Sequence, residues 1–240
     1  DFIKEVEKTS GEDLSEFANK WLVSDVFNYD DLRAFLSKKT KDYKLFFELN
    51  CHDSRLNCLN FLETTSNDYL KIEVVNRLQG EFPKALYSYK DIKFRQALAQ
   101  SIYDIPLEQK VNYESFLKDK SYATIETALF NLWRNFPLER KKYLNETKGI
   151  MGFNDKNVRI LWLTLALITK DYDPVYRRSY LQELTDYTGP KYGFEIRQSA
   201  FSYLKQIQAC REACKSNLKQ ATSHHNWRFK KFAKELLETY

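Results

Sequence analysis

The chain has 240 residues and a formal net charge of +5, with only 6 glycines and 5 prolines. Leucine occurs 29 times and valine 8 times. Because helix breakers and β-branched residues are scarce, the composition favours a nearly all-helical fold and argues against a β-sandwich or barrel. A hydrophobic content of 43% excludes a disordered chain, and 240 residues can enclose a substantial core.

The first 36 residues predict a helix, a break at Gly11 and a second helix. Ser10 is placed to accept a hydrogen bond from the amide of Asp13, whose carboxylate would reach back in an acidic variant of the capping box. An apolar stripe at helical spacing follows, formed by Leu14, Phe17, Ala18, Trp21 and Leu22. This stripe must pack against another surface.

The same segment reads F-I-x-x-x-E-x-x-S-G-x-D-L-x-x-F-x-x-x-W-L from Phe2 to Leu22. The string resembles the closing helices of the catalytic domain in gluzincin zinc aminopeptidases, the aminopeptidase N-like metallopeptidase family. The resemblance implies that residues 1–36 close an upstream thermolysin-like catalytic domain and that residues 37–240 form a HEAT-like helical C-terminal domain. The chain starts inside a helix without an initiator methionine, so we expect it to be part of a longer protein.

Beyond residue 36 the sequence predicts helices in pairs. The predicted pairs are 41–50 with 53–64, 67–79 with 91–102, 106–118 with 121–134, 137–148 with 155–169, 174–187 with 193–207, and 209–221 with 224–240. The last four pairs start 31, 37 and 35 residues apart (106, 137, 174 and 209), which is the period of a helical-hairpin repeat. We therefore expect an all-α fold, an α-solenoid of about six irregular HEAT- or armadillo-like antiparallel pairs.

An arginine recurs near the start of five second helices, at Arg55, Arg95, Arg159, Arg197 and Arg228. One interpretation is structural: an inter-repeat Asp–Arg ladder, in which each guanidinium ties its hairpin to its neighbour. The other is that the row binds substrate or another anion. The candidate substrate-binding residues are Arg159, Arg197 and Arg228, because a positive wall would suit a peptide carboxylate.

The four cysteines and three histidines do not predict a metal or catalytic site. Cys51 and Cys58, and Cys210 and Cys214, are spaced to share a helix face, so we expect free, buried or half-buried thiols. Cys51 beside His52 is not expected to form a nucleophile or metal pair, because adjacent helix residues diverge. The family's H-E-x-x-H and G-x-M-E-N motifs are absent, so no catalytic or metal-binding residue is predicted, and the resemblance places the zinc in the missing catalytic domain.

The resemblance implies a non-catalytic domain that caps the active-site cleft of an aminopeptidase and helps to select peptides. The expected partners are the chain's own catalytic domain and the peptide. One alternative is a stand-alone or zinc-less HEAT-like scaffold that binds proteins, like an inactive relative in the transcription machinery. A nucleic-acid partner is less favoured: residues 205–234 hold eight basic side chains and one acidic, but Phe229 there belongs to an apolar stripe.

No membrane partner is expected, because the longest apolar stretch, residues 160–168, is far shorter than a bilayer span of about 20 residues. The sequence does not indicate a compartment.

Overall fold

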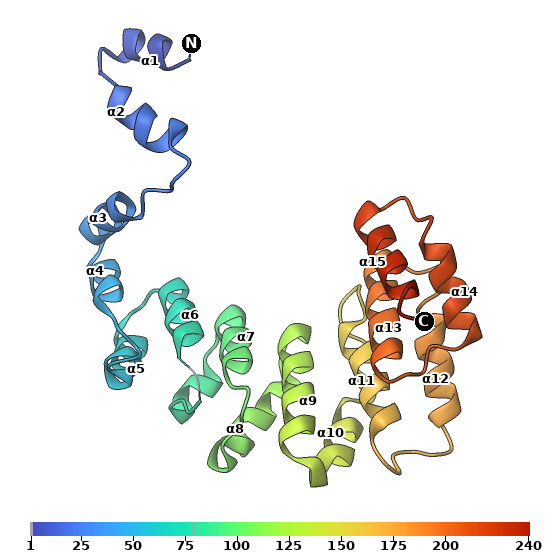
Figure 1. Ribbon diagram of the computed structural model, residues 1–240. Helices are drawn as coiled ribbons and strands as arrows, with labels where there is room; N and C mark the ends of the chain where they lie inside the picture. Colours follow the sequence, from blue (N-terminus) through green and yellow to red (C-terminus); the bar gives the residue numbers. More distant parts are fainter. Residues whose placement is uncertain (1, 79) are drawn as a thin grey trace. The chain divides into compact units, whose positions relative to one another are not determined.

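The computed structural model describes residues 2–78 and 80–240, and all of their regular structure is helical (Figure 1). This confirms the all-α prediction. The chain divides into two compact units, one up to Val74 and one from Val75 to Tyr240. The boundary after residue 36 that the resemblance implies is a different division and stays a prediction.

The first unit is a succession of short helices. They are α1 (Phe2–Ser10), α2 (Ser15–Ala18) with a π-helical turn (Asn19–Val23), α3 (Tyr29–Lys39), α4 (Lys41–Glu48), α5 (Arg55–Thr64) and the start of α6 (Asp68–Arg77). Polar side chains set three of these starts, because Asn28, Thr40 and Ser54 each accept a hydrogen bond from the amide three residues on. The predicted ranges 41–50 and 53–64 are thereby confirmed, apart from residues at their ends.

The predicted capping box between Ser10 and Asp13 is wrong. Ser10 is the last residue of α1, and its hydroxyl donates to the carbonyl of Val6 at 2.8 Å. Gly11 follows with a φ of 75°, which ends the helix before Ser10 can cap another. The Asp13 carboxylate instead accepts from the amide of Ser15 at 2.9 Å, where α2 begins.

The second unit holds the longer helices. They are α7 (Ile92–Ser101), α8 (Lys110–Glu114), α9 (Tyr122–Asn135), α10 (Arg140–Thr147), α11 (Asn157–Ile168), α12 (Arg177–Asp186), α13 (Phe194–Gln206), α14 (Glu212–Ala221) and α15 (Trp227–Leu237). Turns of 3-10 helix precede α7, α8 and α10 at Lys84–Ser88, Leu107–Gln109 and Pro137–Glu139, and a fourth, Ser115–Lys118, follows α8. Each predicted helix in this unit is therefore present within a few residues.

Second helices of the predicted pairs contact one another in chain order: α7 with α9, α9 with α11, α11 with α13, and α13 with α15. Figure 1 shows α9, α11 and α13 running side by side, in yellow-green to orange. First helices fill the other side, since α10 contacts α9 and α11 while α12 contacts α11 and α13. The core lies between these rows and centres on α11, where every residue from Ile160 to Leu167 is buried.

Both cysteine pairs form disulfides, Cys51–Cys58 and Cys210–Cys214, and the described residues contain no free cysteine. The prediction of free thiols is therefore wrong. One cysteine of each pair precedes a helix, α5 or α14, and the other lies in its first turn. The chain bends back at the helix start and brings the Cα atoms to 5.6 and 5.2 Å, within disulfide range. The spacing of the cysteines along one straight helix could not predict this bend of the chain.

Among residues 2–78 and 80–240, no helix combines the length and apolar character required to cross a bilayer.

Candidate functional site

Two arginines of the predicted row pair with acids of the following hairpin. Arg95 at the start of α7 donates to the carboxylate of Asp119 at 2.6 Å. Arg159 in α11 donates to both carboxylate oxygens of Glu183 in α12, at 2.8 and 2.6 Å, and to the carbonyl of Lys148 at 2.9 Å. Burial alone would raise the pKa of Glu183, but the hydrogen bonds from Arg159 and Tyr187 outweigh it and lower that pKa. These contacts support the structural interpretation of the row.

Arg197 repeats the arrangement without a carboxylate. Its side chain is buried and donates to the carbonyl of Thr188 at 2.9 Å and to the Gln220 amide oxygen at 3.1 Å. Burial lowers the pKa of this guanidinium. Arg228 differs, because its side chain is exposed and lies only over the ring of Trp227, 5.4 Å from the centroid.

The three candidate substrate-binding residues make separate contacts in the part of the chain that the structure describes. Arg159 and Arg197 are engaged inside the protein, and each would have to give up internal hydrogen bonds to bind a peptide. Arg228 is the one whose guanidinium is open to a ligand. Substrate binding by these residues stays a prediction.

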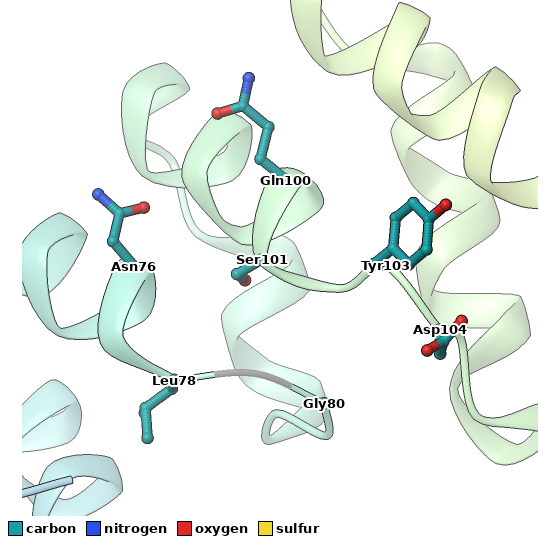
Figure 2. Close-up of a pocket in the computed structure, with 7 residues that line it drawn as sticks. All are labelled: Asn76, Leu78, Gly80, Gln100, Ser101, Tyr103 and Asp104. Atoms are coloured by element: carbon teal, nitrogen blue, oxygen red, sulfur yellow. The ribbon is translucent and has the colours of Figure 1, made fainter. Parts of the chain in front are cut away.

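A cavity of about 660 Å³ opens beside the end of α7 (Figure 2). Gln100 and Asn76 extend their amide groups toward the same side of it, and the ring of Tyr103 stands beyond them. The side chains of Asn76, Gln100 and Tyr103 are exposed. Polar side chains of the lining come from Asn76, Gln100, Ser101, Tyr103 and Asp104, and Leu78 and Gly80 complete it.

Arg134 from α9 fixes the far wall of this cavity. Its guanidinium stacks on the Tyr103 ring, 3.2 Å from the centroid. It also donates to the Tyr103 carbonyl and to the Asp104 carboxylate, both at 2.6 Å. Asn135 donates to the same carbonyl at 3.0 Å. The Tyr103–Asp104 turn is therefore held in one position by α9.

A second cavity of about 380 Å³ shares Gln100 and Tyr103 with the first. The rest of its lining comes from the row of second helices: Glu126, Thr127, Phe130 and Asn131 of α9, Leu161 of α11 and Tyr203 of α13. We call the two cavities together the second-helix groove. Its lining contains two carboxylates, at Asp104 and Glu126, and no lysine or arginine.

Glu126 is a partly buried acid of the groove. Burial raises its pKa, and the hydrogen bond that it accepts from the Asn157 amide at 2.5 Å offsets this only in part. Burial, together with the nearby Glu126 carboxylate, also raises the pKa of the Tyr203 phenol. Amides, phenols and a carboxylate in an open groove can hydrogen bond to a peptide backbone and attract its cationic groups. They do not form a nucleophile–base pair.

The first helices of the chain expose a large apolar surface. No described residue from Phe2 to Leu45 is buried. The exposed large apolar residues between Phe2 and Phe35, which we call the N-terminal apolar face, are Phe2, Phe17, Trp21, Leu22, Val23, Val26, Phe27, Tyr29 and Phe35. A large exposed apolar surface of this kind is typical of a region that packs against another protein segment.

The structure also places the remaining candidates. Among the described residues, no group of three or more histidine, cysteine or acidic side chains is arranged to hold a metal ion. Cys51 is bound in a disulfide and is therefore no nucleophile beside His52. In the basic segment 205–234, Phe229 is fully buried, as the stripe predicted, while Trp227 is exposed.

Sequence reasoning missed the second-helix groove. Its residues lie between positions 76 and 203 and share no motif. The available signal was weak: Gln100, Glu126 and Tyr203 all fall on predicted second helices, and each lines the groove. A search for polar and aromatic residues along those helices could have found them.

Comparison of the chain with protein-family models, curated proteins and solved structures found no match. The resemblance to the aminopeptidase family therefore rests on the motif from Phe2 to Leu22 alone.

Proposed function

We propose that this chain is the non-catalytic, C-terminal helical region of a zinc-dependent aminopeptidase. In this proposal residues 1–36 close a thermolysin-like catalytic domain, and residues 37–240 form an irregular HEAT-like α-solenoid that caps the cleft and helps to select peptides. The contacts between successive second helices support the solenoid arrangement. Zinc would be held by the catalytic domain, where it would activate water for peptide hydrolysis.

The observation that carries the proposal is the N-terminal apolar face. Its residues from Phe2 to Val23 lie on the helices that bear the family-like string, and Phe17, Trp21 and Leu22 of that string are all exposed. In water this surface costs free energy, roughly 25 cal/mol per Å² of apolar area. Packing against the body of a catalytic domain would remove the cost, which fits helices that complete such a domain.

The second-helix groove supports the peptide part of the proposal. Its free amides at Asn76 and Gln100 can pair with the N–H and C=O of an extended backbone, whatever its sequence. Phe130 and Tyr203 offer apolar contact beside them. Recognition of backbone over side chains is what a domain needs if it is to hold many different peptides.

The first test measures zinc content and aminopeptidase activity in the longer natural protein that carries this segment. We expect one zinc per chain and cleavage of an aminoacyl 4-nitroanilide. The double change Phe17→Asp and Trp21→Asp should lower activity by undocking the helices. Leu138→Asp, which places the same charge at a fully exposed position of the second unit, should not. A zinc-free protein without peptidase activity would contradict the proposal and favour the scaffold that binds proteins.

The second test measures binding of a short unstructured peptide of alanine, serine and leucine to this chain. Gln100→Ala and Tyr103→Ala should each weaken binding about three- to ten-fold through lost hydrogen bonds and contact. Gln206→Ala, an exposed glutamine outside the groove, is the matched control. Equal loss in all three variants, or no binding by the parent chain, would remove the groove from the proposal.

A further inference from the structure

The second unit contains another cavity, of about 580 Å³, at the end of α11, the start of α12 and the α13–α14 connection. Its charged lining consists of three arginines, Arg177, Arg178 and Arg211. Its apolar lining includes Leu167, Ile168 and Ile207. No carboxylate belongs to the lining. We call it the arginine cavity.

The three guanidinium groups have no partner in the part of the chain that the structure describes. Among the described residues, none of them makes a hydrogen bond, an ion pair or a ring contact, and all three side chains are exposed. By contrast, Arg95 and Arg159 bind carboxylates. The arginines that line this cavity are thus available for an external anion, and they come from two different helix starts.

A contribution to helix stability does not explain why arginines occupy these three positions. Arg177 and Arg178 are the first two residues of α12, whose first turn contains no acidic residue and whose start has no side-chain cap. Arg211 stands at the cap position of α14, again without a side-chain hydrogen bond to the helix. Positive side chains at helix N-termini face the positive end of the helix dipole and are unfavourable there. An anion bound by the three arginines would offset this unfavourable interaction with the helix dipoles.

The apolar wall adds a second requirement on the ligand. Leu167 is nearly buried, whereas Ile168 is 46% exposed beside the arginines. On the other side, the Cys210–Cys214 disulfide spans Arg211 and holds this part of the connection to the first turn of α14. A cavity of this volume, part apolar and part cationic, suits a small ligand that carries both kinds of group.

We propose that the arginine cavity binds an amphiphilic carboxylate, a small organic acid whose anionic head group is carried on a short apolar chain. The guanidinium forks would take the carboxylate through charge-assisted hydrogen bonds, and the leucine and isoleucine side chains would take the hydrocarbon. The site is separate from the second-helix groove in its lining residues. The inference holds whether or not the chain belongs to a peptidase.

Calorimetric titration of this chain with three probes tests the proposal. Octanoate carries both groups, acetate only the head group, and octanamide the hydrocarbon without the charge. We expect octanoate to bind about ten-fold more tightly than acetate or octanamide, because each control loses one of two contacts. No octanoate binding, or equal binding of acetate, would overturn the proposal.

Variants locate the site. Arg178→Gln and Arg211→Gln should each weaken octanoate binding about ten-fold. Lys230→Gln removes the same charge from an exposed position on α15 and should leave binding unchanged. Ile168→Ser should weaken octanoate but not acetate, and its partial exposure makes misfolding a small risk. Equal loss with Lys230→Gln would show attraction to net charge alone and would contradict the assignment.

Discussion

The two compact units differ in how completely they bury their apolar side chains. In the second unit, α11 is enclosed on all sides and Trp162, Tyr113 and Phe201 are fully buried. In the first unit, burial begins only at Phe46, and the rings of Trp21 and Tyr29 both contact Phe27, with centroids 5.8 and 4.8 Å apart. The second unit is stabilised by an extensive core, whereas the helices before Phe46 expose their large apolar side chains. The difference teaches that sequence hydrophobicity alone does not show where a core is complete.

The largest expected effect comes from truncating a tryptophan in each unit. Trp162→Ala removes a buried indole that donates to the Leu144 carbonyl at 2.8 Å, and we expect the free energy of unfolding to fall by about 3–5 kcal/mol. Trp21→Ala removes one ring of an exposed pair and should cost about 1 kcal/mol or less. Hydrogen–deuterium exchange, read separately for peptides of each unit, measures both. A larger loss from Trp21→Ala would show that the helices before Phe46 have a core of their own.

An ion pair in each unit gives the next comparison. Glu183→Gln should lower the free energy of unfolding by about 2–3 kcal/mol at pH 7, because Arg159 loses two charged hydrogen bonds in a half-buried site. Asp31→Asn breaks the exposed pair with Lys20 and should change nothing measurable.

The pH dependence checks the cause. The pKa of Glu183 is lower in the folded protein than its ordinary value, so its stabilisation is present above the unfolded-state pKa and is lost as pH falls through the folded-state pKa. Urea unfolding of Glu183→Gln and the unchanged chain should therefore converge in acid. A constant difference from pH 7 to pH 3 would indicate a packing effect in place of the ion pair.

The last comparison uses the two disulfides. They close short loops, with sequence separations of 7 and 4 residues, and the chain-entropy relation gives about 2 kcal/mol for each. Because the first unit has few other buried contacts, reduction should speed exchange throughout α4 and α5 but only near the start of α14. The double variant Cys51→Ala and Cys58→Ala, without reductant, controls for the reagent. Equal exchange in both units after reduction would show that the first unit does not depend more strongly on its disulfide than the second.

The positions of the helices could be predicted from the sequence. Prolines, glycines and apolar residues at helical spacing act on neighbours along the chain, and these local effects fix where α9, α11 and α13 form. The arginine row could also be recognised in the sequence, because each repeat of the fold makes the same contact from an equivalent position. Arg95 and Arg159 bind the following hairpin as the structural interpretation predicted.

Only the tertiary structure decided which arginines are engaged inside the protein and which are open to a ligand. Arg197 and Arg177 look alike in sequence, yet one is enclosed by Thr188 and Gln220 while the other lines an open cavity. The groove beside Gln100 and the disulfides at two helix starts depend in the same way on how the chain bends. Spacing along a helix carries no information about a turn that brings distant side chains together, so this part of the site could not be predicted from the sequence.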